Sequence, residues 1–216
     1  MSFLFSLGLL RKHGLHNDYD KFLELSKKLN KSPYGNDDGD EFTLLDVLRL
    51  CGLGYCMWLL QCLPIAVHSD IHSMLKKFAI FWVEKSLIYF DGIVKIDITP
   101  HEIIQINNTG EFYNKCIDKF IALHKEARPS SFLSDDFKAR WAAAHAAEAM
   151  EALVVCAGNG KNISHSSGGA YNAARSAAEA ISTASARSFE QEIYIRNEVH
   201  TRQRQQFVQL LSLLRI

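Results

Sequence analysis

The chain has no excess of charge of either sign and no paired cysteine motif. Lysine plus arginine and aspartate plus glutamate number 24 each among 216 residues, so no overall field draws the protein to nucleic acid or to an anionic membrane. The five cysteines are odd in number and lie in apolar helical patterns without the C-x-x-C pairs of zinc sites. Buried thiols in a reducing compartment follow from this pattern, and we predict a cytoplasmic protein.

The sequence also lacks a run long enough to span a membrane. Residues 50–67 carry no formally charged side chain, but Gly52, Gly54 and Pro64 interrupt them. The helix that these residues permit is too short for a bilayer core of about 30 Å. The first five residues have no basic segment and no small-residue cleavage site, so we expect no signal peptide.

Alanine is abundant in two blocks, residues 142–147 and 173–180. Alanine has the best helix propensity and lets neighbouring backbones approach closely. We therefore predict two alanine-rich helices, 134–157 and 170–187, joined by a small, polar and mobile loop at 158–169. The fold class is all-α: a single domain, 1–216, packed around these two helices, with 92–108 as the place for any subdivision into two helical parts.

The remaining apolar periodicity also indicates helices. Thr43 with Asp46 resembles a capping pair, and Ser69 is the expected cap of a long helix. Residues 93–98 alternate, but a lone strand would have no partner, so we expect an extended connector there. One or two helical turns are expected at 3–10, and further helices at 18–30, 44–50, 55–63, 69–90, 100–107, 109–128 and 189–214.

Histidines are the main candidates for metal or catalytic chemistry. His68 and His72 have the i, i+4 spacing of paired zinc ligands, but the Ser69 cap would leave His68 outside the helix. His145 lies three residues before Glu148 and is expected to pair with it. No catalytic, cofactor or metal site is predicted. A metal-dependent helical enzyme that uses His68 and His72, or His145 and His165, stays open as an alternative.

Three polar segments are candidates for contact with a partner. The first is an acidic loop at 36–41, whose residues do not have the spacing of a calcium-binding EF-hand. The second is the 158–169 loop, which does not match the P-loop motif. The third is a run of basic residues at 196–204. A nucleic-acid-binding module that uses the basic run is a further alternative. The candidate partner-binding residues are Asp37, Asp38, Asp40, Glu41, Lys161, Asn162, His165, Arg202 and Arg204.

Five segments carry a resemblance to a known set of proteins: LLDVL at 44–48, WLLQCLP at 58–64, FAIFWVE at 78–84, ARWAAA at 139–144 and AARSAA at 173–178. Their order resembles that of alanine-rich immunity proteins and related phage and prophage proteins, over two thirds of the chain. A glycine-histidine motif of those proteins is replaced here by Gly169-Ala170-Tyr171-Asn172. The resemblance implies a non-enzymatic inhibitor without cofactor. Such a protein binds and blocks a partner protein, either a toxin or a host defence complex, as an anti-CRISPR does.

Overall fold

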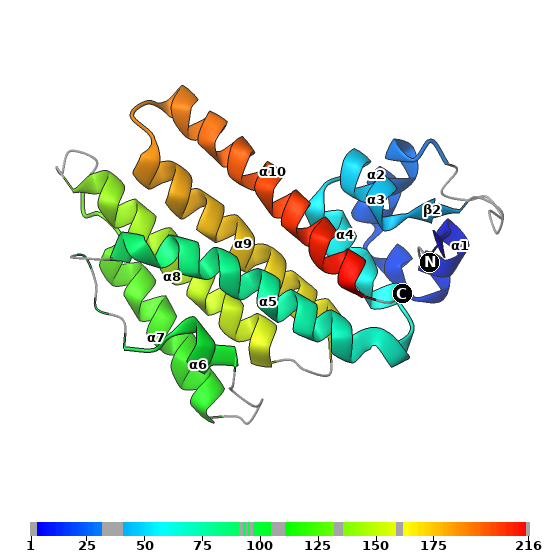
Figure 1. The fold of residues 1–216 in the computed structure, drawn as a ribbon, viewed down its shortest axis with the longest axis horizontal. Helices are drawn as coiled ribbons and strands as arrows, with labels where there is room; N and C mark the ends of the chain where they lie inside the picture. The colour runs from blue at the N-terminus through cyan, green and yellow to red at the C-terminus, as the bar shows by residue number, and fades with distance from the viewer. Residues whose placement is uncertain are drawn as a thin grey trace.

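The structure is a computed structural model that describes residues 4–31, 41–90, 93, 95, 97–104, 111–131, 136–158 and 162–214. These residues form an all-α domain, as the sequence predicts, with one two-stranded sheet (Figure 1). No helix in them is long and apolar enough to cross a bilayer. The α-helices are α1 (Leu7–Lys12), α2 (Tyr19–Lys28), α3 (Leu44–Leu50), α4 (Leu53–Leu59), α5 (His68–Leu87), α6 (Pro100–Ile104), α7 (Glu111–Ala127), α8 (Phe137–Gly158), α9 (Ile163–Ser185) and α10 (Phe189–Leu213). Short 3-10 helices lie at η1 (Leu15–Asn17), η2 (Leu60–Cys62), η3 (Ile65–Val67) and η4 (Ile88–Phe90).

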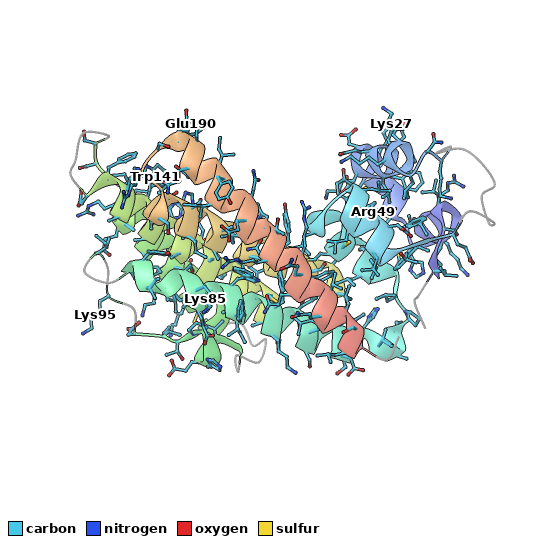
Figure 2. All side chains as sticks on the ribbon, turned by 45° about the horizontal axis from the view of Figure 1, so that its top comes forward. Lys27, Arg49, Lys85, Lys95, Trp141 and Glu190 are labelled. Atoms are coloured by element: carbon cyan, nitrogen blue, oxygen red, sulfur yellow. The ribbon has the colours of Figure 1, made fainter. Side chains whose placement is uncertain are left out.

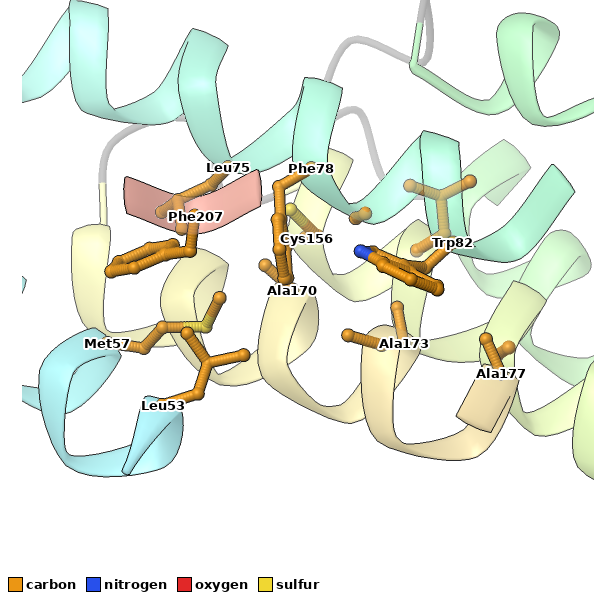
Figure 3. Packing of buried hydrophobic residues seen from close by; sticks show 14 of the residues in the cluster. Leu53, Met57, Leu75, Phe78, Trp82, Cys156, Ala170, Ala173, Ala177 and Phe207 are labelled. Atoms are coloured by element: carbon orange, nitrogen blue, oxygen red, sulfur yellow. The ribbon is translucent and has the colours of Figure 1, made fainter. Parts of the chain in front are cut away.

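The two alanine-rich helices, α8 and α9, form the centre of the domain. They lie side by side, α5 packs on both, α7 covers the outer side of α8, and α10 covers the outer side of α9 (Figure 1). Figure 3 shows Phe78 and Trp82 of α5 above Ala170 and Ala173 of α9. Small side chains on α8 and α9 therefore leave room for the aromatic rings of the neighbouring helices. The fully buried alanines are Ala142, Ala143, Ala144, Ala146, Ala147 and Ala149 on α8, and Ala170, Ala173, Ala177, Ala178 and Ala180 on α9.

Gly169 marks the closest approach of α8 and α9. A Cβ placed on Gly169 would lie 2.5 Å from the backbone N of Cys156 and 2.9 Å from the carbonyl O of Ala152. Real carbon atoms do not approach that closely, so only glycine permits this contact between the two backbones.

The connection between these two helices differs from the prediction. α9 begins at Ile163, not at Ala170, so residues 164–169 are helical and the mobile loop predicted over them is wrong. The side-chain O of Asn162 caps the helix by accepting hydrogen bonds from the backbone N–H groups of Ser164 (3.0 Å) and His165 (3.4 Å). The two glycines within residues 164–169 do not end the helix, because Gly169 packs directly against the α8 backbone. Residues 159–161 lie outside the described residues.

The N-terminal elements form a smaller group around α4. Strand β1 (Leu4–Phe5) pairs antiparallel with β2 (Phe42–Thr43), and the rings of Phe5 and Phe42 stack 6.0 Å apart. Two-residue strands are too short to show alternation, and the sequence analysis missed them. The predicted Thr43–Asp46 capping pair is confirmed, with the Thr43 N–H donating to the Asp46 carboxylate at 2.9 Å. Figure 2 shows Lys27 and Arg49 of this group at one end of the molecule and Trp141 and Glu190 at the other.

The start of α5 also differs from the prediction. The helix begins at His68, directly after η3, and Val67 at the N-cap makes no side-chain bond. Ser69 is therefore inside the helix rather than its cap, because the preceding 3-10 turn already leads the backbone into α5. Among the described residues of 93–98, none is in a strand, which agrees with the predicted connector.

Candidate functional site

The main cavity of interest is a partly open pocket of about 640 Å³ between α2, α4, α9 and α10. Leu53 and Met57 of α4 contribute to its lining and are buried. This volume lies in the range of about 300–1,000 Å³ that is typical of ligand pockets. Three aromatic side chains line the pocket, Tyr55, Trp58 and Tyr171, and so do four basic ones, Lys21, Arg175, His200 and Arg204.

Two glycines at the start of α4, Gly52 at its N-cap and Gly54 in its first turn, bring pocket residues close to the backbone. Gly52 has a φ of +88°, which disfavours other residues, and the Nη2 atom of Arg204 lies 3.7 Å from where its Cβ would be. The Tyr171 ring lies so close to Gly54 that a Cβ there would be 3.1 Å from Cζ. The sequence Gly52-Leu53-Gly54 therefore lets one side chain of α10 and one of α9 approach α4.

The pocket lining is basic and contains no carboxylate among the described residues. Lys21 pairs with Asp18 at 2.8 Å on the surface. Arg175 and Arg204 have no ion-pair partner within 4.0 Å in the described part of the chain, and both side chains are exposed. Two guanidinium groups with free hydrogen-bonding capacity thus border the same cavity, which favours an anionic ligand group.

A buried glutamine links α10 to α9 at the edge of the pocket. Gln203 is 1% exposed, and its Nε2 donates to the carbonyl O of Ala174 at 2.7 Å. This bond fixes the orientation of the amide, so its Oε1 accepts from Nδ1 of His200 at 2.9 Å. Gln203 therefore holds His200, and the turn of α10 that carries Arg204, against α9.

The aromatic residues of α4 are fixed by contacts with α2. The Tyr55 hydroxyl donates to the carboxylate of Glu24, and burial, followed by this hydrogen bond, raises the pKa of Tyr55 well above its usual value. Tyr55 and Trp58 meet edge to face with ring centroids 6.3 Å apart. Lys21 lies 5.9 Å from the centroid of the Trp58 ring. The aromatic lining of the pocket is therefore held in place on one side by α2.

The structure brings one of the predicted partner-binding residues into the pocket, Arg204. Arg202 lies instead on a neighbouring groove between α5 and α10 and forms an ion pair with Glu198. Asn162 is the cap of α9, and His165 is exposed in the first turn of that helix. Glu41 is exposed just before β2. Asp37, Asp38, Asp40 and Lys161 lie outside the described residues.

Neither histidine pair that the sequence suggested, His68 with His72 or His145 with His165, forms a shared binding site in the structure. His68 Nε2 lies 2.9 Å from the carbonyl O of Leu63, while His72 is buried with Nε2 3.4 Å from the Ser166 hydroxyl. Because residue 169 of α9 lies opposite residue 156 of α8, His145 and His165 are separated along the helix pair by roughly 20 Å at 1.5 Å per residue. Among the described residues, no three His, Cys, Asp or Glu side chains are arranged to hold a metal ion.

The predicted pairing of His145 with Glu148 is confirmed, and it has a second histidine. One oxygen of Glu148 lies 3.1 Å from Nδ1 of His145, and the other lies 3.3 Å from Nδ1 of His124 on α7. Burial raises the pKa of Glu148, but the His145 hydrogen bond and the charges of His145, His124 and Arg175 outweigh it and leave the pKa lowered. Burial lowers the pKa of His124 by more than Glu148 raises it. This cluster fastens α7 to α8.

The five cysteines are free thiols, as their apolar settings predict. Burial raises the pKa of each, to about 12 for Cys62 and Cys156. Cys51 lines the pocket, and burial raises the pKa of its thiol too, despite the charge of Lys28. Thiols with raised pKa values hold little of the nucleophilic thiolate form at neutral pH.

Comparison of the chain with protein-family models, with curated proteins and with solved structures gave no match. The pocket itself escaped the sequence analysis because its basic residues are far apart in the chain. Arg175 is the one charge within AARSAA at 173–178, and a cation in an otherwise small-residue helix face is the signal that could have indicated it.

Proposed function

We propose that this protein acts by binding, as an inhibitor of bacterial or phage origin that blocks a partner protein. The observation that carries the proposal is the pocket, where Arg175 and Arg204 border one cavity without an ion-pair partner among the described residues and with no carboxylate in the described lining. A partner that presents an acidic group at this face would neutralise the two arginines. Charge complementarity of this kind sets orientation and the rate of association.

The resemblance of segments 44–48, 58–64, 78–84, 139–144 and 173–178 to alanine-rich immunity proteins supports the same proposal. Within it, the partner is a toxin or a subunit of a defence complex. Two of these segments also contribute Trp58 and Arg175 to the pocket. The resemblance and the pocket therefore overlap at these two positions.

The basic run at 196–204 gives little support to the nucleic-acid alternative. Arg196 pairs with Glu179 at 2.9 Å and with Glu192 at 2.7 Å, and Arg202 pairs with Glu198. Guanidinium groups held by carboxylates are less available to phosphates. Of the arginines in this run, Arg204 is the one without an ion pair in the described residues.

The proposal is tested with the purified product of the neighbouring gene as the partner. Arg175→Glu and Arg204→Glu should each weaken binding at least tenfold by calorimetry, because each reverses a charge of the pocket. Arg187→Glu is the matched control, since Arg187 is also exposed but lies beyond the other end of α9. Binding that is absent, or that is as strong in the double variant as in the wild type, would refute the proposed role of the pocket.

A further inference from the structure

The exposed aromatic surface of the pocket narrows the chemistry of its ligand. Tyr171 is 36% exposed, and Tyr55 and Trp58 are half-buried. All three line the pocket together with the buried side chains of Leu53 and Met57. Such a surface contacts water in the free protein and favours a flat apolar group in its place. Aromatic anchors in pockets are also the usual centres of tight protein interfaces.

The guanidinium of Arg204 lies beside this aromatic surface. Its Nη2 is 3.7 Å from the Cβ position of Gly52, and the Tyr171 ring is 3.1 Å from that of Gly54, two residues along the same turn. Cα atoms two residues apart are at most about 7 Å from each other, so the Arg204 guanidinium and the Tyr171 ring approach neighbouring points of the same backbone, within reach of adjacent side chains of one bound peptide. Arginine binds carboxylates through two parallel N–H···O bonds.

The cavity has room for a few side chains of a partner but not for a whole helix. A volume of about 640 Å³ is that of a drug-sized ligand. A helix is about 10–12 Å across with its side chains and would not enter it. An extended segment that inserts two or three side chains fits this size.

We infer that the pocket binds a segment of the partner protein in which two carboxylate side chains flank an aromatic one. This inference rests on the proposed function, and it names the partner's contact. The ring packs on Tyr171 and Trp58, and the carboxylates pair with Arg204 and Arg175. Lys21 of α2, which pairs with Asp18, lies at the same pocket.

The test uses the full chain and capped pentapeptides. The probe is Gly-Glu-Phe-Glu-Gly, and its controls replace both glutamates by glutamine or the phenylalanine by alanine. The probe should bind at least tenfold more tightly than either control. Arg204→Gln and Tyr171→Ala should each abolish the difference, while Arg187→Gln leaves it unchanged. Residues 171, 187 and 204 are exposed, so the variants should fold, which circular dichroism checks.

The other outcomes separate this inference from the proposed function. Equal binding of probe and alanine control, with both lost in Arg204→Gln, would overturn the aromatic part and leave an anion site. Failure of all peptides, with arginine-dependent binding of the neighbouring gene product, would overturn the inference and leave the proposed function. Adenosine monophosphate that binds more tightly than every peptide and depends on Arg204 would overturn both, because the pocket would then serve a small molecule.

Discussion

Gly169 offers the sharpest test of the α8–α9 contact. In Gly169→Ala the new methyl group would lie 2.5 Å and 2.8 Å from the N and Cα of Cys156 and 2.9 Å from the O of Ala152. Carbon atoms pack at about 3.5–4.0 Å, so the backbones must separate by roughly 1 Å. Cys156 and the neighbouring Ala170 are both fully buried. No flexible side chain can move aside to relieve the clash.

The size of the effect follows from two opposing contributions. Overpacking costs about 1–3 kcal/mol, and a clash with backbone atoms belongs at the upper end. Alanine in place of glycine inside a helix returns about 0.5–1 kcal/mol. The free energy of unfolding should therefore fall by about 2 kcal/mol. For a chain of this size, about 2–4 °C of Tm corresponds to each kcal/mol, so Tm should fall by about 4–8 °C.

Gly168→Ala is the matched control, because a Cβ there has nothing within 4 Å. This variant has the higher helix propensity of alanine without the steric clash, so it should raise the free energy of unfolding by about 0.5–1 kcal/mol. Thermal melts followed by circular dichroism, with urea titrations of the same three proteins, measure both changes. Equal shifts in the two variants, or a Gly169→Ala protein that is more stable than the wild type, would show that α8 and α9 are not in backbone contact at this point.

Three further predictions concern the same helices and the caps. Ala143→Leu and Ala177→Leu, both at fully buried positions, should each lower the free energy of unfolding by about 1–3 kcal/mol; unchanged melting of both would place the core elsewhere. Asn162→Ala should lower it by about 1 kcal/mol because the cap of α9 is lost, and an unchanged urea midpoint would contradict that cap. Hydrogen bonds from the Thr43 backbone N–H and side chain lower the pKa of Asp46. Its contribution, measured against Asp46→Asn, should be complete above the unfolded pKa of about 3.9 and disappear as the pH falls through the lower folded value. A stabilising contribution of Asp46 that grows as the pH falls would contradict its lowered pKa.

The sequence predicted what depends on neighbours in the chain. The capping pair of Thr43 and Asp46 is three residues apart, and the pairing of His145 with Glu148 has the same spacing. Both follow from backbone geometry within one helical turn. The second partner of Glu148, His124, comes from another helix, and no local pattern indicated it.

Gly168 and Gly169 show why a helix boundary was misplaced. Two consecutive glycines next to serines are a loop signal in an isolated peptide. In the domain the same glycine at 169 allows α9 to contact the α8 backbone, and the packing gained there outweighs the low helix propensity. The choice between loop and helix was therefore made by a contact with Cys156, thirteen residues earlier in the sequence.

The sequence by itself determined the helical class and the alanine-rich centre, because alanine's helix propensity and small size act at every position where it occurs. Only the tertiary structure decided where the basic pocket lies. Lys21, Arg175 and Arg204 come from three helices, and each alone is an ordinary surface cation. Their convergence on one pocket depends on the packing of α4, α9 and α10 around Gly52 and Gly54, since distance in space, not spacing in the chain, sets the electrostatic field.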